Sequence, residues 1–462
     1  MISRRLGAIV GAVTALGVAV AFRIPSFLST HDLGYDDGVY ASSVMLMREG
    51  FDPFRDFFSS QGPLFLPFVR LFDMIGIGGL RAPRSAMVFT GAAIAAGIYL
   101  LAAMDHGRSR AALAALLGAS SGLLLTAAGP IQSDGIALAL GLFALAAAAG
   151  DHERHRWLAP LAGTLIGLGL ATKSLHLFPL AIVVLVLISL RAQRSALVAA
   201  VFSAAVAGAI VTLPWGFEDV WDQYVVFHLS RPRVFNPIGH IGKLTRFMLN
   251  FELPLIVIIL AGTTLKLGRF DPVLTSEPRK RLPVWLVVLW LAMTAFSLIF
   301  ITGVEIGFHR FVGFAIPPLI LLAMRTPLPS RLALVFMLLA VPYQWTHLPF
   351  MDAIHPAGLE AEMIEAIATI PENRFVVADQ PGMVWSAGRV SHPDTVDISF
   401  GMIDSGRVTS QDVTDAAADE RTCAFLAFSS RFLTLGIDQP PPDYGIAIAE
   451  GDQYLAFRPG CQ

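Results

Sequence analysis

The chain has 462 residues, of which 55% are hydrophobic and only 15% are charged, and its mean hydropathy is +0.64. Soluble domains carry about 25% charged residues, so the composition excludes an ordinary soluble protein and predicts a membrane protein. The formal net charge is −2, which gives no reason to expect nucleic acid as a partner. The sequence contains no Walker loop, GxSxG, HExxH or dinucleotide motif.

Apolar segments predict the membrane spans, because a transmembrane helix needs about 20 mostly apolar residues. The first segment resembles a signal peptide, but its apolar run continues to Phe22 without a small-residue cleavage site, so we interpret it as a retained span. We predict about eleven spans, several of them short: 6–22, 84–104, 111–128, 132–149, 157–172, 175–190, 195–213, 253–267, 283–301, 309–324 and 331–346.

The basic residues between these spans predict the orientation of the chain. They fall in alternate loops, and all lie on one side if the spans are counted as above: Arg4, Arg5, Arg108, Arg110, Arg154, Arg156, Arg191, Arg194, Lys266, Arg269, Arg279, Lys280, Arg281, Arg325 and Arg331. The positive-inside rule makes that side the cytoplasm. We therefore expect a multi-pass protein of a bacterial-type inner or plasma membrane, with its N-terminus in the cytoplasm and its C-terminus outside.

Two regions follow from this topology. Residues 1–350 form the transmembrane domain, whose outer loops 23–83 and 214–252 are too long to be simple connections. In loop 23–83 we predict amphipathic surface helices at 38–49, with Asp36 or Asp37 as N-cap and Gly50 as the stop, and at 62–75, opening at Pro63.

We predict that residues 351–462 form a small extracytoplasmic α/β domain. The expected helix is 357–370, and the expected strands are 374–379, 423–428, 444–449 and 453–457. The two cysteines, Cys423 and Cys461, both fall here. They pair if this domain folds in an oxidising compartment, or remain two thiols, and the sequence leaves both outcomes open.

Ionisable residues inside a membrane are costly and therefore mark sites. Within or beside the spans they gather near the outer ends: Asp134, Lys173, His176, Glu252, Glu305, His309 and Arg310. A proton-coupled transporter would place such charges at the bilayer midplane. Their position at one face instead favours a reaction at the membrane surface with a lipid-borne substrate.

The catalytic candidates are Asp36 and Asp37. Sequence neighbours do not share a helix face, so one would act as general base while the other caps or orients. The alternative is that both only cap a surface helix.

The substrate-binding candidates come from four outer segments. Lys173 can hold a phosphate as a point charge, and Arg231 can bind one in a bidentate manner. The span beginning near Arg310 also offers free N–H groups to an anion. The full set of candidates is Asp134, Lys173, His176, His228, Arg231, Glu305, His309 and Arg310. The alternatives are a helix-dipole charge for Asp134 and interfacial anchors or caps for the others.

The stretch GYDDGVYASSVMLMREGFDPFRDFFSSQGPL resembles the first outer loop of the GT-C glycosyltransferases, the group of the protein O-mannosyltransferases and lipid A aminoarabinose transferases. The resemblance extends to GFHRFVGFAIPPLILLA and to the C-terminal tail. It implies inversion at the anomeric carbon, a polyprenyl-phosphate sugar donor, and Asp36 as the base. In many relatives a basic residue precedes Pro-Pro-Leu, whereas this chain has Gln61, Gly62, Pro63 and Leu64. The phosphate contact would then fall to Lys173, Arg231 and Arg310.

We therefore expect a membrane glycosyltransferase, of hexosyl or pentosyl type, that moves a sugar onto a hydroxyl acceptor of the cell envelope. A divalent metal near Asp36 and Asp134 is compatible with the sequence, which does not settle it. The alternatives are a flippase for lipid-linked sugars, which the uncharged midplane argues against, and a non-catalytic scaffold for envelope assembly.

Overall fold

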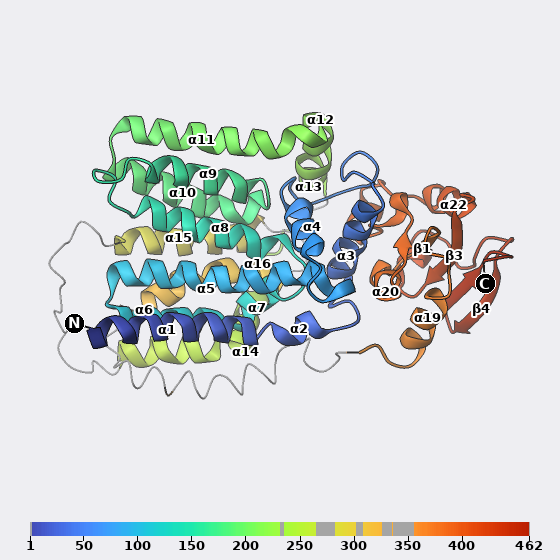
Figure 1. Cartoon of the computed structure of the whole chain (residues 1–462), viewed down its shortest axis with the longest axis horizontal. Helices are drawn as coiled ribbons and strands as arrows, with labels where there is room; N and C mark the ends of the chain where they lie inside the picture. Colours follow the sequence, from blue (N-terminus) through green and yellow to red (C-terminus); the bar gives the residue numbers. More distant parts are fainter. Residues whose placement is uncertain are drawn as a thin grey trace.

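The computed structural model describes residues 2–231, 235–264, 282–301, 308–325 and 355–461, together with Val335. A bundle of apolar helices forms one end of the molecule and a small α/β domain forms the other, with the first outer loop between them (Figure 1). The N-terminus lies at the end of the bundle that is farthest from the α/β domain. The expected span 331–346 lies outside the described residues apart from Val335.

The bundle contains ten of the expected spans as helices or helix pairs. They are α1 (Ile2–Ala21), α5 (Ser85–Asp105), α6 (Arg108–Ser120) with α7 (Gly122–Ala128), α8 (Ser133–Ala148), α9 (Leu158–Leu170), α10 (Ser174–Arg191), α11 (Arg194–Thr212), α14 (Pro237–Thr264), α15 (Val284–Phe296) and α16 (Phe308–Val312) with α17 (Ile316–Ala323). Among the described residues, five helices are long and apolar enough to cross a membrane, or six if the bent pair α6–α7 is one span, and four apolar helices are shorter. The count of eleven spans is therefore not confirmed.

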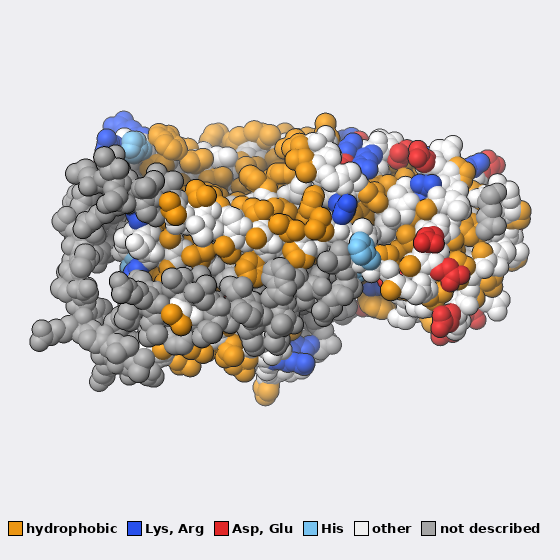
Figure 2. Space-filling view, turned by 60° about the horizontal axis from the view of Figure 1, so that its bottom comes forward, with side chains coloured by type: hydrophobic (Ala, Val, Ile, Leu, Met, Phe, Trp, Pro, Cys, Tyr) orange, Lys and Arg blue, Asp and Glu red, His pale blue; other side chains and the backbone are white. Residues whose placement is uncertain are grey.

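The outer flank of the bundle is apolar. Helix α11 exposes Val198, Phe202 and Ile210 by 67%, 68% and 62%. Figure 2 shows hydrophobic side chains along the visible flank of the bundle and acidic side chains on the α/β domain. An apolar surface of this extent is stable against lipid and not against water.

Small residues allow the helices to approach closely. Gly163 of α9 lies against α11 so tightly that a Cβ there would be 2.0 Å from the carbonyl oxygen of Ala200. Gly167, one turn later, meets Ala204 in the same way. Close backbone approach of this kind supplies packing energy where the hydrophobic effect is absent.

One span is broken and its neighbour is kinked at the same level. Helices α6 and α7 meet at an angle of 62°. Glu252 interrupts α14 with φ −129° and ψ 19°. Its Oε1 accepts hydrogen bonds from Ser121 Oγ at 2.5 Å and from the amide of Leu123 at 2.9 Å. The side chain at the kink of α14 therefore caps the first turn of α7.

The first outer loop contains three α-helices, α2 (Ile24–Leu28), α3 (Tyr35–Arg48) and α4 (Phe65–Ile75), and ends in the 3-10 helix Gly79–Arg84. The expectation that Asp36 or Asp37 is the N-cap of α3 is wrong, because Gly34 takes that position with φ 127° and both acids lie in the first turn. The first turn still favours acids through the helix dipole. The predicted stop at Gly50 fits, since Gly50 follows the helix with φ 92°.

The α/β domain contains all four predicted strands and one more. Its elements are α19 (Leu359–Ile367), β1 (Phe375–Ala378), α20 (Pro381–Ser386), β2 (Val390–Ser391), α21 (Phe400–Asp404), α22 (Ser410–Ala418), β3 (Thr422–Ala427), α23 (Arg431–Thr434), β4 (Gly445–Glu450) and β5 (Gln453–Phe457). The sheet order is β2-β1-β3-β5-β4, with β1 parallel to β2 and β3, and β5 antiparallel to β3 and β4. Cys423 and Cys461 form a disulfide, which decides between the two outcomes that the sequence left open.

This domain packs directly on the first outer loop. Ser42 of α3 donates to the carbonyl oxygen of Pro381 at 2.8 Å. Val39 and Phe65 of the loop share a buried apolar core with Phe375 and Trp385 of the domain. Helix α3, which carries the acidic pair, is therefore held between the bundle and the α/β domain.

Candidate active site

Asp36 lies in the first turn of α3, at the junction of the bundle and the α/β domain. Its Oδ2 accepts a hydrogen bond from Arg310 Nη1 at 2.5 Å. Arg310 belongs to α16, 274 residues later in the chain. The carboxylate side chain of Asp36 is 30% exposed, so it forms an ion pair and still faces open space.

Two further cations act on the same carboxylate. Burial alone would raise the pKa of Asp36, but the charge of Arg310 and its hydrogen bond, with the charges of Lys173 and Arg231, lower it below its ordinary value. Burial in turn lowers the pKa of Lys173. The three basic residues act on Asp36, and even with Asp134 as a second acid they leave an excess of positive charge that suits an anion.

Gln61 connects the first outer loop to Lys173. Its Oε1 accepts from Lys173 Nζ at 3.0 Å and from Ser133 Oγ at 2.6 Å. Lys173 also lies over the ring of Phe311, 5.5 Å from its centroid. The ammonium group of Lys173 thus lies beside Gln61, the residue that stands where many GT-C relatives have a basic residue.

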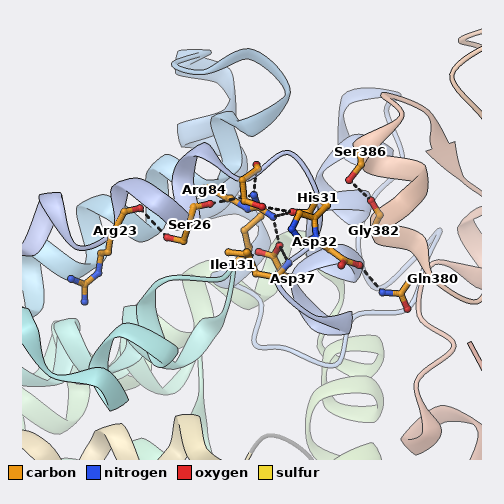
Figure 3. Close-up of polar contacts among 12 residues, drawn as sticks. Arg23, Ser26, His31, Asp32, Asp37, Arg84, Ile131, Gln380, Gly382 and Ser386 are labelled. Carbon is orange, nitrogen blue, oxygen red and sulfur yellow. Dashed lines mark hydrogen bonds and ion pairs between the residues drawn. The ribbon is translucent and has the colours of Figure 1, made fainter. Parts of the chain in front are cut away.

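Asp37 has a different environment from Asp36. Its carboxylate is fully buried and accepts from Arg84 Nη2 at 2.5 Å, from the amide of Ile131 at 2.7 Å and from the amide of Leu33 at 3.0 Å (Figure 3). These bonds leave no exposed oxygen to take a proton from a substrate. These contacts suit Asp37 to the orienting role that was expected of one of the two acids, beside a general base at Asp36.

Asp134 is 1% exposed at the start of α8. Its charge acts on both Lys173 and Arg310. Its Oδ1 has no hydrogen-bond partner among the described residues. Because a buried acceptor without a partner is costly, this oxygen is suited to accept a hydrogen bond from a bound molecule.

The histidine candidates lie around this cluster in supporting positions. His176 stacks on Phe311 with ring centroids 3.8 Å apart, and His228 Nε2 lies 2.8 Å from the carbonyl oxygen of Ser60. Arg231 lies over the ring of Phe227 at 5.4 Å. His309 belongs to α16, but its side chain is not described, and Glu305 lies outside the described residues.

A family model places this site in a known context. Residues 63–302, just over half of the chain, match the model of Glycosyltransferase family 87. The chain belongs to glycosyltransferase family 87. No curated protein matches it by sequence.

Solved structures share the fold of this family 87 glycosyltransferase. ArnT from Cupriavidus metallidurans bound to undecaprenyl phosphate is similar over 97% of both chains, with a TM-score of 0.63 and 14% identity. The oligosaccharyltransferase AglB from Archaeoglobus fulgidus, in complex with an inhibitory peptide and a dolichol-phosphate, is similar over 91% of this chain and 69% of its own, with a TM-score of 0.52 and 14% identity. These likenesses confirm the GT-C fold class, and with the family they identify a membrane glycosyltransferase.

The α/β domain contributes a second layer to the candidate site of this glycosyltransferase, which was not predicted from the sequence. Tyr35 Oη lies 3.5 Å from Asp397 Oδ1, and the guanidinium of Arg431 lies 3.5 Å from the centroid of the Tyr35 ring. Burial raises the pKa of Asp397, and the charge of Asp36 contributes to the rise. The only local signal was the tyrosine directly before the acidic pair, because Asp397 and Arg431 follow no motif.

The expected metal near Asp36 and Asp134 stays a prediction. Within the described part of the chain, neither acid belongs to a group of three His, Cys, Asp or Glu side chains close enough to share an ion. Such a group does occur nearby, at the contact between the first outer loop and the α/β domain.

Proposed function

We propose that this family 87 glycosyltransferase moves a sugar from a polyprenyl-phosphate carrier to a hydroxyl acceptor at the outer face of the membrane, with inversion. The observation that carries the proposal is the pairing of Asp36 with Arg310 inside a cluster that also holds Lys173 and Arg231. One acid for a hydroxyl proton and three cations for a phosphate are the groups that such a transfer needs. The ligands of the two similar structures, undecaprenyl phosphate and a dolichol-phosphate, support the same donor class.

The proposed reaction is a single displacement. The acceptor oxygen attacks the anomeric carbon from the side opposite the phosphate and transfers its proton to Asp36. The bond between the anomeric carbon and the phosphate oxygen breaks, and the lipid phosphate leaves with its charge offset by Arg310, Lys173 and Arg231. No acid needs to protonate this leaving group, which differs from the hydrolysis of ordinary glycosides.

Contact with Arg310 makes the basicity of Asp36 depend on whether the donor is bound. Before the donor binds, Arg310 holds Asp36 ionised and lowers its pKa, which makes it a weak base. A donor phosphate can bind the same guanidinium, whose several N–H donors can serve two acceptors, and its negative charge then offsets the charge that lowers the pKa of Asp36. Binding of the donor thus weakens the hold on Asp36 and raises its basicity when a substrate is in place.

An apolar groove supports a lipid carrier. A cavity of about 420 Å³ lies between α9 and α11, lined by Gly167, Leu170, Ala171, Ala204, Ala205, Gly208, Ala209, Thr212, Leu213 and Phe217. Two of its lining residues, Leu213 and Phe217, are exposed by 69% and 68%, and Ala171 precedes Lys173 by two residues. We assign it to the isoprenoid chain, since its end then lies beside a cation that can hold the phosphate.

Replacement of Asp36 tests the proposal. Asp36→Asn keeps the shape of the side chain but removes the base, so we expect transfer from a labelled polyprenyl-phosphate sugar to fall by about 10²-fold or more. Asp52→Asn is the matched control, because Asp52 is a half-exposed acid of the same loop that pairs with Arg55 at 3.8 Å. Near-normal transfer by an intact Asp36→Asn protein would exclude Asp36 as the base.

The same assay in detergent separates the enzyme from a flippase. Detergent micelles have no compartments, so a protein that only translocates lipid-linked sugars gives no product there. Turnover of wild-type protein in detergent is the expected result.

A further inference from the structure

Three side chains with metal-ligand chemistry meet where the first outer loop contacts the α/β domain. His31 and Asp32 come from the segment before α3, and Glu360 comes from α19. One candidate ligand atom from each lies within 4.8 Å of those of the other two. We propose that these three residues bind a divalent cation of the zinc class, which fastens the α/β domain to the loop that carries Asp36.

The distances between the candidate ligand atoms leave room for a metal ion between them. His31 Nδ1 and Glu360 Oε1 are 3.9 Å apart, which is too long for a hydrogen bond. Zinc lies about 2.0–2.2 Å from nitrogen and carboxylate oxygen, so an ion between two ligands holds them about 3–4 Å apart. One imidazole and two carboxylates form a donor set that zinc accepts, with water completing the coordination.

The surrounding contacts hold the ligands in place without a metal. Arg84 Nη2 donates to the carbonyl oxygen of His31 at 2.6 Å, and Gln380 Nε2 donates to Asp32 Oδ2 at 2.7 Å. Figure 3 shows Asp32 reaching from the loop toward Gln380 and Gly382 of the α/β domain. A Cβ at Gly382 would be 1.9 Å from Asp32 Oδ2, so glycine is needed for this approach. Orientation by outer contacts of this kind is typical of metal ligands.

The location gives the cation a structural task. Arg84, which positions His31, also binds the buried carboxylate of Asp37. A cation bound by the three residues would connect Glu360 of α19 to His31. Arg84 contacts both His31 and Asp37, so the connection continues to the first turn of α3, which carries Asp36. This inference does not depend on the proposed reaction, because it concerns the attachment of the α/β domain.

Zinc binding to the full-length protein tests the site. Protein in lipid nanodiscs is stripped with a chelator and titrated with Zn²⁺ against a chromophoric competitor. We expect one equivalent to bind, and at least about tenfold weaker binding in the double variant His31→Gln, Glu360→Gln. The matched control is His155→Gln, Glu372→Gln, which removes the same two residue types from exposed positions elsewhere. Absence of bound zinc in wild type, or equal affinity in both double variants, would overturn the proposal.

Two measurements cover the case in which the double variant misfolds. X-ray absorption of the wild-type zinc complex is expected to show nitrogen and oxygen ligands with one imidazole, and a shell without imidazole contradicts the site. Glu360→His exchanges one ligand for another and should retain zinc, and should also retain the rise in unfolding temperature that zinc gives wild type. Loss of both effects in an intact Glu360→His protein would contradict Glu360 as a ligand.

Discussion

Asp36 depends on residues that are distant in sequence. The aspartate itself stands out in the printed chain, as one of an acidic pair in a loop too polar to cross a membrane. Its partner Arg310 of α16 is 274 residues away and meets it only in the folded protein. Its neighbour Asp37 takes a different role because it faces Arg84, which is buried beneath it.

The pH dependence of the reaction should reveal the Asp36–Arg310 pair. In wild type the pKa of Asp36 lies below its ordinary value, so the carboxylate stays ionised as the pH falls toward about 5. Arg310→Gln removes the strongest charge that lowers this pKa and leaves burial, which raises it. We therefore expect the acidic limb of kcat/KM to move to higher pH, in addition to any loss of phosphate binding.

A profile of kcat/KM from about pH 5 to 8 measures this shift. Arg55→Gln is the control, since Arg55 is a half-exposed arginine of the same loop. An unchanged acidic limb in an active Arg310→Gln protein would mean that Arg310 does not set the pKa of Asp36.

At the scale of elements, the sequence predicts helices well where the apolar run is uninterrupted. The break between α6 and α7 was not predicted, because the segment 111–128 contains no proline and was expected to form one continuous span, although Ser120, Ser121 and Gly122 stand at the break. The break exists because Ser121 and Glu252 satisfy the amides that it frees. Likewise, α14 begins at Pro237, well before the expected start of its span, because part of loop 214–252 is helical.

Glu252 should therefore be important for stability. Glu252→Ala leaves the amide of Leu123 without its acceptor in a buried setting, which costs about 1–3 kcal/mol. We expect a lower unfolding temperature in nanodiscs, and a smaller decrease for Glu252→Gln, which keeps an acceptor oxygen. Glu218→Ala removes an exposed glutamate of an outer segment and is the control. If Glu252→Ala unfolds at the wild-type temperature, the cap does not stabilise the break.

At the scale of the whole molecule, the orientation in the membrane remains a prediction with two supports. The basic residues of the loops favour a cytoplasmic end of the bundle, and the disulfide between Cys423 and Cys461 favours an oxidising compartment for the α/β domain. Asp36 and its cations lie at the junction with that domain, so the orientation also decides on which side the reaction occurs.

Reporter fusions test the orientation. Alkaline phosphatase fused after Gln462 should be active, because the enzyme folds only outside the cytoplasm, and green fluorescent protein should fluoresce when fused after Gln193. The reverse pattern would place Asp36 on the cytoplasmic side and would remove the outer-face reaction.

The sequence by itself determined the membrane class, most helices of the bundle, the four main strands and the acidic pair, because these depend on local composition and periodicity. The tertiary structure decided which aspartate faces open space, which cation pairs with it, and that Asp397 and Arg431 approach Tyr35 from the α/β domain. Those outcomes depend on contacts between segments hundreds of residues apart. No local pattern encodes such contacts, because each requires both segments to be packed in place.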